Sequence, residues 1–503
     1  VADDGIENLP LNLLRFHGVG TGRILDDVEA GAVVMARLAS LCSGWSAVRP
    51  LVVERLCTLL GQSVLPRIPA EGSVGASGDL TPLSYIAALL VGERECSFEG
   101  RVRTAGEVLA EFWRNHFNVS FTKAFPAHAY ITGYETDVIR AHTLGSFPAM
   151  LAASARHPAM LFYLDNHLSR RPPSKAELNE IEHKARQASG SRSQGEDAAA
   201  IAAQRGLNEN YARELLELHT LGVDNGYDQG DVVAAAEALT GWTILGGRLG
   251  SHEFHFDAKM HWSEHRRFLG FSLRKDKDDG PGQGERILEI LSEHKGTAGF
   301  LSTKLARYLV SDEPPAELVS KVSKAYLKKD GDIPAMVRAV VDHELFWDRS
   351  NYRTKFKTPF EFVVSALRIT GAEVTDTDGL TRALVGMGQP IYHCDDPTGY
   401  YDTAEAWLDP GVMAPRWKLA LELASNEVRG VRIPDAFFYE LPSELGPLKW
   451  MRELVAQVLP GGASSRTLAM LYEVVRENPA PDYERLGKRI LGLLLGSPEF
   501  QEQ

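Results

Sequence analysis

The segment 72–87, GSVGASGDLTPLSYIA, holds the residues of this 503-residue chain whose types and spacing most directly suggest chemistry. At its centre lie Ala76, Ser77 and Gly78. If the Gly78 amide nitrogen attacks the Ala76 carbonyl carbon and two waters leave, one with the Ser77 hydroxyl, the product is an imidazolone ring bearing a methylidene. Glycine suits this step because its nitrogen is unhindered and its backbone reaches angles closed to other residues. The tripeptide predicts a backbone electrophile, and an ordinary turn before a helix is the alternative.

A helix that begins near Thr81-Pro82 must hold this tripeptide in place. Proline is tolerated in a first helical turn, and Asp79 has the side chain of a helix cap. Gly72 and Gly75 permit a strained turn before it. The segment is therefore expected to run from a tight turn directly into a helix.

The sequence around the tripeptide, residues 5–111, resembles the aromatic amino-acid ammonia-lyase family, which includes histidine and phenylalanine ammonia-lyases. The similar stretches are LPLNLLRFHGVGTG at 9–22, the helix-like DDVEAGAVVMARLASLCSG at 26–44, and AVRPLVVERLCTLLGQSVLPRIPAEGSVGASGDLTPLSYIA at 47–87. The resemblance implies that Ala76, Ser77 and Gly78 form a methylidene-imidazolone autocatalytically, with no dissociable cofactor. It also implies that this ring attacks a small amino-acid substrate and expels ammonia.

The resemblance assigns a substrate-binding role to His17. This residue follows Leu13-Leu14-Arg15-Phe16, at a position where the family has histidine for histidine or tyrosine substrates and leucine for phenylalanine. A histidase-like or tyrosine-lyase-like pocket is therefore implied. Taken alone, a histidine beside Gly18 and Gly20 is typical of a structural loop.

Other groups that the family uses have no counterpart that we find in this sequence. They are a catalytic tyrosine in an upstream TGFG-type segment, the long helices of a central bundle, and downstream substrate-binding Asn, Tyr, Arg and Gln or Glu residues. Family active sites are assembled from several subunits through that bundle. We therefore expect an incomplete lyase segment that is inactive alone, and we predict no particular oligomeric state. Apolar side chains such as Val28, Met35 and Leu38 are expected to be exposed in it. An active lyase and a non-catalytic helical interaction module are the alternatives.

From Phe112 onward the sequence resembles a different family, the bacterial domain-of-unknown-function family 1800. The similar segments are FWRNHFNVS at 112–120, RHPAMLFYLDN at 156–166, the long stretch 205–244, TKLARYLVSDEPP at 303–315, FKTPFEFVVSALRITGA at 356–372, 397–417 and ILGLLLGSPEFQ at 490–501. We predict a mainly all-α protein with a lyase-like N-terminal fragment, 1–111, followed by a large helical domain, 112–503. Whether this fusion is physiological stays open.

The composition excludes several classes of function. A formal net charge of −13 at pH 7 argues against nucleic acid as a partner, since phosphate binding needs a basic surface. No apolar run is long enough for a membrane span, and no signal peptide opens the chain. Cys42, Cys57, Cys96 and Cys394 form no CxxC pair, which favours reduced thiols and a cytoplasmic location. The resemblance to family 1800 implies that many of its members are exported. The alternative to a cytoplasmic location is therefore an exported protein whose signal was lost with the native N-terminus.

Helical periodicity predicts a hairpin of two helices within 205–244. The first helix is expected between Asn208 and Gly222, and the second is expected to open with the capping pair Asp228 and Asp231. A calcium loop at Asp224, Asp228 and Asp231 is disfavoured because the glycine and glutamate of an EF-hand are missing. We interpret Glu214, Glu217 and His219 as a solvated face, and Trp113, His116 and Phe117 as a buried aromatic anchor. Loops or linkers are expected at 184–205 and 274–285, which are polar or rich in Gly and Pro.

The histidine-rich stretch 251–265 is the remaining chemical candidate. If 252–257 is extended, alternation places Glu253, His255 and Asp257 on one face. His255, Asp257 and His261 are weak candidates for a transition-metal site, because imidazole and carboxylate suit Zn, Fe or Mn. Their spacing matches no HExxH-type motif, so a histidine-rich surface loop is preferred and no metal is predicted.

Overall fold

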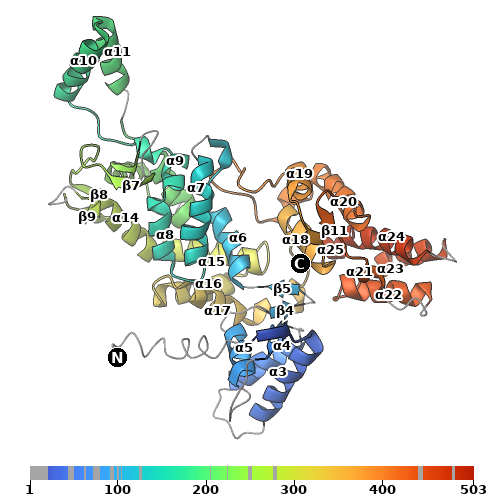
Figure 1. The fold of residues 1–503 in the computed structure, drawn as a ribbon. Coiled ribbons are helices and arrows are strands. Elements are labelled where there is room, and N and C mark those ends of the chain that lie inside the picture. The colour runs from blue at the N-terminus through green and yellow to red at the C-terminus, as the bar shows by residue number, and fades with distance from the viewer. Residues whose placement is uncertain are drawn as a thin grey trace. The chain divides into compact units, whose positions relative to one another are not determined.

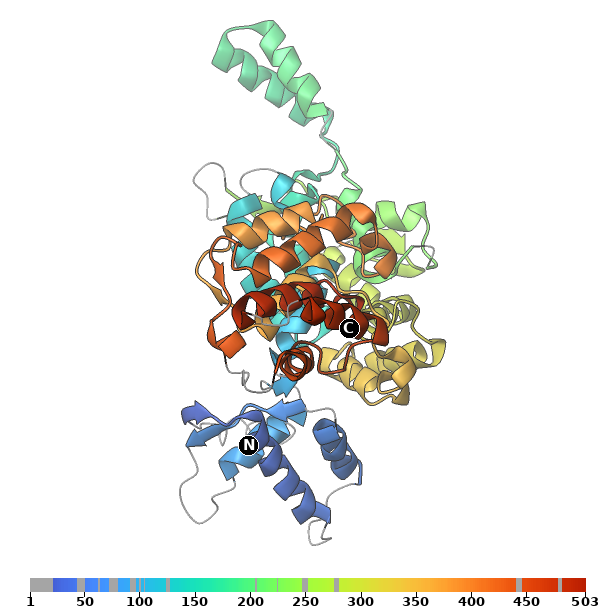
Figure 2. The same ribbon diagram turned by 90° about the vertical axis from the view of Figure 1, so that its right-hand side faces the viewer.

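The computed structural model describes residues 21–42, 50–61, 64–71, 80–90, 96–98, 101–103, 105–123, 127–203, 206–223, 225–246, 252–275, 280–439, 446–477 and 482–503. These residues are mainly helical with a few short strands, which confirms the predicted fold class (Figures 1 and 2). They divide into two compact units. One comprises the described residues within 1–109, 356–389 and 404–503, and the other comprises those within 110–355 and 390–403.

The described residues in the N-terminal part of the first unit form three helices and two small sheets. The elements are β1 (Thr21–Ile24), α3 (Asp27–Cys42), α4 (Pro50–Gly61), β2 (Val64–Pro66), β3 (Pro69–Glu71), α5 (Leu80–Leu90), β4 (Cys96–Phe98) and β5 (Arg101–Arg103). Strand β1 pairs antiparallel with β3, and β2, β4 and β5 form an antiparallel sheet in that order. The buried core consists of Val34, Leu38, Leu41, Leu56, Ile68, Tyr85 and Ile86.

Helix α3 confirms the helix expected at 26–44. It opens with a reciprocal cap, in which the Glu29 N–H donates to Asp26 Oδ1 at 2.8 Å and the Asp26 N–H donates to Glu29 Oε2 at 3.0 Å. Val28 and Met35 are exposed, as expected, with 82% and 54% of their surface accessible. Leu38 is buried, so the expectation that it is exposed was wrong: it packs in the small core formed by α3, α4 and α5.

In the C-terminal part of the first unit, the described residues form helices and one two-stranded pair. The elements are α18 (Pro359–Ile369), β10 (Glu373–Val374), α19 (Asp378–Gly386), η7 (Ala404–Trp407), α20 (Pro410–Ala424), β11 (Val431–Arg432), α21 (Ala436–Tyr439), α22 (Pro447–Val458), α23 (Ser465–Arg476), α24 (Tyr483–Leu495) and α25 (Pro498–Gln501). Helix α24 packs against α20 and α22, and its Leu491, Leu494 and Leu495 lie in a large apolar core. The buried Arg416 guanidinium fixes the chain end by donating to Lys357 O and Gln501 Oε1, at 2.8 and 3.0 Å.

The second unit is built mostly of helices. They are the greater part of α6 (Ala105–His116), η1 (Phe121–Lys123), α7 (Ala127–Tyr134), η2 (Glu135–Arg140), α8 (Phe147–Arg156), α9 (Pro158–Tyr163), η3 (Asn166–Leu168), α10 (Lys175–Ser189), α11 (Arg192–Ala203), α12 (Asn210–Glu214), η4 (Leu215–Thr220), α13 (Gln229–Ala238), α14 (Gly282–Glu293), α15 (Lys295–Leu309), α16 (Ala316–Lys328), α17 (Ile333–Val341), η5 (Glu344–Phe346) and η6 (Arg349–Asn351). Two of these, η2 and η4, are π-helical turns that continue α7 and α12. The predicted hairpin is confirmed as α12–η4 followed by α13.

The described residues of the second unit also form two antiparallel strand pairs. Strand β6 (Trp242–Leu245) pairs with β7 (Glu253–Phe256), and β8 (Arg266–Phe268) pairs with β9 (Phe271–Leu273). The capping pair is confirmed, since Asp228 and Asp231 form a reciprocal cap at the start of α13. Asp231 also accepts the Leu269 N–H at 2.6 Å, which holds the β8–β9 turn against this helix. Asp224 lies outside the described residues.

The loop predicted at 184–205 is wrong for most of its length. Helix α10 continues to Ser189 and α11 covers Arg192–Ala203, and the two pack against each other. Gly190 ends α10 in the left-handed conformation, with φ of 69°, so the small residues there make a turn between helices. Gly195 permits their close approach, because a Cβ there would lie 2.8 Å from the Glu182 carbonyl oxygen.

The loop predicted at 274–285 is partly wrong. Residues 274–275 and 280–281 are irregular, but α14 begins at Gly282, and 276–279 lie outside the described residues. The Gly and Pro residues mark the start of the helix rather than a longer linker.

Candidate functional site

The tripeptide that could carry chemistry, Ala76-Ser77-Gly78, lies outside the described residues, as does His17. The elements on either side are described. Strand β3 ends at Glu71, and α5 begins at Leu80, with Pro82 in its first turn. The helix expected near Thr81-Pro82 is therefore confirmed.

Helix α5 is fixed by packing. Tyr85 and Ile86 are 5% and 4% exposed and lie in the core with residues of α3 and α4. Strand β3 is held by its pairing with β1, in which Glu71 is opposite Thr21 and Pro69 is opposite Ile24. The two elements that flank 72–79 are thus each tied to the N-terminal part of the chain.

The structure does not assemble the three weak metal candidates into a site. His255 is exposed on β7, and the alternation predicted for 252–257 is confirmed for Glu253–Phe256, where Phe254 and Phe256 are half-buried. His252 does not continue it, because its backbone is left-handed, with φ of 55°. Asp257 Oδ1 accepts the Lys259 N–H at 2.9 Å, which forms a local turn. His261 is buried, and its Nδ1 lies 2.8 Å from the Thr240 carbonyl oxygen. Within the described ranges, no three His, Cys, Asp or Glu side chains are placed to hold a metal ion.

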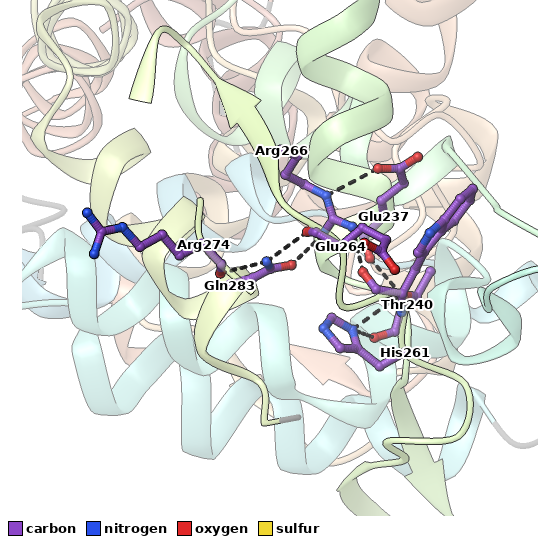
Figure 3. A network of polar contacts seen from close by, with 8 residues as sticks. Glu237, Thr240, His261, Glu264, Arg266, Arg274 and Gln283 are labelled. Carbon is purple, nitrogen blue, oxygen red and sulfur yellow. Dashed lines mark hydrogen bonds and ion pairs between the residues drawn. The ribbon is translucent and has the colours of Figure 1, made fainter. Parts of the chain in front are cut away.

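His261 belongs to a network of polar contacts around Arg266 (Figure 3). The Arg266 guanidinium donates to Glu237 Oε2 at 3.1 Å, to Gln283 Oε1 and to the Trp262 carbonyl oxygen. Gln283 in turn donates to the carbonyl oxygens of Glu264 and Arg274, at 3.0 and 2.8 Å. Burial lowers the pKa of Arg266, while Glu237 raises it. These bonds join β8 and its flanking loops to α13 and α14. We therefore interpret the network as structural.

Two buried histidines, His116 and His219, lie in the aromatic core of the second unit. Trp113, His116 and Phe117 of the predicted anchor are all at most 1% exposed, which confirms it. His219 was expected on a solvated face, and this was wrong, because it is 1% exposed. In η4 the Leu221 N–H bonds to the Leu216 carbonyl oxygen, five residues back, so the wide turn brings His219 inward.

The histidine pair is held in its neutral form. His116 Nε2 lies 3.1 Å from the backbone carbonyl oxygen of His219. Burial lowers the pKa of both imidazoles, that of His219 to about 3, and the positive charge of Lys304 lowers both further. Neutral imidazoles in an aromatic cluster are suited to packing and offer no base at an open surface.

Sequence reasoning missed a cluster around Glu135, the first residue of the π-helical turn η2. Arg114 Nε and an Arg114 terminal nitrogen donate to its two carboxylate oxygens at 2.9 and 2.6 Å. The Tyr392 hydroxyl donates to the same carboxylate, and Arg140 Nε lies 3.0 Å from it. Burial raises the pKa of Glu135, but the bonds from Arg114 and Tyr392 outweigh it, so the pKa is lowered. Tyr392 lies 257 positions from Glu135 in the sequence, so no local sequence pattern could have predicted this contact.

Comparison with known families divides the chain in two. The model of the family described as "Protein of unknown function (DUF1800)" matches residues 98–502. The chain belongs to this family. The family model "Aromatic amino acid lyase" matches residues 1–119, so the chain joins a lyase-like N-terminal segment to a DUF1800 region, and the two matches overlap at 98–119.

The relatives of the N-terminal segment are enzymes of amino-acid chemistry. A histidine ammonia-lyase of Koribacter versatilis is 46% identical over 101 residues, 20% of each chain. A MIO-dependent tyrosine 2,3-aminomutase of Streptomyces globisporus is 48% identical over 103 residues, 20% of this chain and 19% of that one. The chain spans about a fifth of the length of these curated relatives.

A solved structure of a tyrosine aminomutase from Streptomyces globisporus aligns with 67% of this chain and 85% of its own. The identity is 17% and the TM-score is 0.18, which is too low to indicate a common fold. None of the described helices of the DUF1800 chain combines the length and apolar composition that a membrane span needs.

Proposed function

We propose that the N-terminal segment retains the ring-forming chemistry of an aromatic amino-acid lyase, and that the chain alone does not turn over amino acids as a lyase. The observation that carries the proposal is the lyase match over residues 1–119, which includes Ala76, Ser77 and Gly78. In this proposal the tripeptide closes to a methylidene-imidazolone, and no dissociable cofactor is needed. The small amino acid it would attack is histidine or an aromatic one, with His17 in the substrate pocket.

The lack of turnover follows from how little of a lyase is present. The matched segment spans about a fifth of each curated relative, while residues 98–502 match another family. Eliminating ammonia requires removal of a weakly acidic proton, and a positioned general base typically contributes about 10²–10⁴-fold in rate. Beyond the matched segment the chain continues as another family, so residues 120–502 do not supply the lyase groups that orient the substrate for this step, and we expect activity below detection.

Intact-mass spectrometry of the full chain tests ring formation. A ring predicts a mass lighter than the sequence mass by two waters, and Ser77→Ala should abolish this difference. Ser73→Ala, in the same segment, is the matched control and should leave it unchanged. A full-chain mass equal to the sequence mass would refute the ring.

Ammonia release from histidine, tyrosine and phenylalanine tests the second part of the proposal, that the chain alone does not turn over amino acids. We expect none above background. Turnover that disappears in Ser77→Ala would overturn the proposal in favour of an active lyase, with the missing groups supplied by the rest of the chain.

The proposal also covers the cellular location of the chain and the kinds of partner that it does not bind. We propose a cytoplasmic protein that binds neither nucleic acid nor membrane. Cys42, Cys57 and Cys394 are free thiols in the structure, and the formal net charge of −13 opposes phosphate-backbone binding. Fractionation of cells and electrophoretic mobility assays with DNA would test these points.

A further inference from the structure

A cavity of about 410 Å³ lies along helix α15 in the second unit. Of the nine residues that line it, seven come from this one helix, among them Lys295, Gly299, Phe300, Lys304 and Arg307. No aspartate or glutamate is among the nine. The cavity is therefore walled by cations in a chain whose overall charge is strongly negative.

Helical spacing explains why these residues share one wall. Lys295, Gly299 and Thr303 follow each other at intervals of four, as do Phe300 and Lys304, so they lie on one face. The opposite face of α15 is apolar and buried, with Ala298, Leu301, Leu305 and Ala306 at most 1% exposed. The core thus fixes the rotation of the helix and the direction in which its cations point.

Among the described residues, neither Lys295, Lys304 nor Arg307 forms an ion pair with a carboxylate. Lys304 Nζ lies 5.7 Å from the centre of the Phe300 ring, and Arg307 Nε donates to the Asp312 carbonyl oxygen at 3.1 Å. By contrast, Lys355 in the same unit is paired with the Asp312 carboxylate at 2.6 Å.

Lys304 is the least solvated of the three cations. Burial lowers the pKa of its ammonium, the Asp402 carboxylate raises it, and Arg307 lowers it further. Burial of a cation without a paired carboxylate is unfavourable, and an anion placed beside it would offset that penalty. The helix N-terminus adds little, because the His294 side chain already accepts the Gly296 N–H at 3.0 Å.

We propose that this cavity binds a small phosphate monoester, with the phosphate beside Lys304 and Arg307, which lie three residues apart on α15, and the organic part against Phe300 and Val319. Two cations match the charge of a dianion, and guanidinium and ammonium groups are the usual phosphate ligands. The volume lies in the range of small-molecule sites and exceeds what a bare phosphate needs. The ring of Phe300 and the side chain of Val319 provide the apolar contact for the remainder.

Calorimetric titration of the full chain with phenyl phosphate, inorganic phosphate and benzyl alcohol tests this. We expect phenyl phosphate to bind more tightly than inorganic phosphate and benzyl alcohol not to bind. Lys304→Gln should weaken phenyl phosphate binding about tenfold, the loss of one charge-assisted contact. Lys324→Gln, an exposed lysine of α16 outside the cavity, is the control and should bind as the parent chain does.

Gly299 gives a second test that removes no native side chain. A Cβ at this position meets nothing within 4 Å, so Gly299→Ala and Gly299→Asp can both be accommodated. Gly299→Ala adds bulk to the wall without a change of charge, so it is the reference against which the effect of an added charge is measured. Gly299→Asp adds a carboxylate to the wall and should abolish binding. The proposal is overturned if the parent chain binds no phenyl phosphate at millimolar concentration, or if Gly299→Asp binds as well as Gly299→Ala.

Discussion

The Nε2 atom of His116 lies 3.1 Å from the backbone carbonyl oxygen of His219, deep in the second unit. A carbonyl oxygen can only accept, so His116 Nε2 carries the proton and donates it. Among the described residues, His116 Nδ1 and His219 Nε2 are buried without a hydrogen-bond partner. A proton added at either nitrogen would create a buried cation, and none of the described residues forms an ion pair with it.

This relationship predicts that the chain loses stability at acid pH through its histidines. In the unfolded chain both imidazoles titrate near pH 6.5, whereas in the folded chain the pKa of His219 is about 3 and that of His116 is also lowered. Between these values the unfolded state binds more protons. The unfolding free energy should therefore fall as pH drops below about 6.5, by on the order of 1 kcal/mol per pH unit and histidine.

Urea unfolding between pH 7.5 and pH 4.5 measures this slope. His219→Gln should make it shallower, because one of the two groups no longer titrates. His255→Gln, which changes an exposed histidine of β7, is the control and should leave the slope as it is. An unchanged slope in His219→Gln would contradict the buried, neutral state of this residue.

A second prediction concerns the carboxylate of Glu135. Glu135→Gln removes the charge that Arg114, Arg140 and Tyr392 all contact, and leaves the Arg114 guanidinium, with 20% of its side chain exposed, without its ion-pair partner. We expect a loss of about 1–3 kcal/mol in unfolding free energy. Glu196→Gln breaks the exposed pair of Glu196 with Arg192 and should change stability by less than about 1 kcal/mol. Equal losses in the two variants would show that the Glu135 cluster is no stronger than a surface pair.

A third prediction compares two glycines at the fifth position of a helix. In α24, a Cβ on Gly487 would lie 2.8 Å from the rings of Phe438 and Trp450, whereas on Gly299 of α15 it would meet open space. Alanine favours a helix over glycine by about 0.5–1 kcal/mol, so Gly299→Ala should stabilise by that amount. Gly487→Ala should destabilise by about 1–3 kcal/mol because its side chain overpacks a dense core. Thermal unfolding of the two variants gives the sign, and a stabilised Gly487→Ala would contradict the packing around α24.

The features that could be predicted from sequence are those set by neighbouring residues. The cap formed by Asp228 and Asp231 and the helix at 26–44 depend on spacings of a few residues, and the structure confirms both. The turn at Gly190 was misread because small polar residues between two helices have the same composition as a linker.

Other features depend on contacts that no local pattern encodes. His219 is buried because η4 is a π-helical turn, and an ordinary helical period would place it differently. Glu135 is bonded to Tyr392 across 257 positions of sequence. The tripeptide Ala76-Ser77-Gly78 could be found from sequence alone, because its chemistry depends on adjacent residues, but its geometry is outside the described residues.

The last prediction concerns the boundary near residue 111. Helix α6 runs continuously from Ala105 to His116, and Leu109 and Ala110 are each 2% exposed, so a polypeptide that begins at 112 would cut through a buried helix. The family match begins at 98. We therefore expect residues 98–503 to be soluble and to unfold in a cooperative thermal transition. A chain of residues 112–503 should also fold, but with a lower midpoint.

The fragment 1–111 is expected to behave differently. Its described core has seven buried apolar residues, and α3 leaves Val28 and Met35 exposed, which is a small core for a piece of this length. It should aggregate or remain partly unfolded when made alone, as judged by circular dichroism and light scattering. If instead 98–503 precipitates while the full chain melts in one transition, the lyase-like segment is needed for the DUF1800 region to fold, and residue 111 does not divide two independent domains.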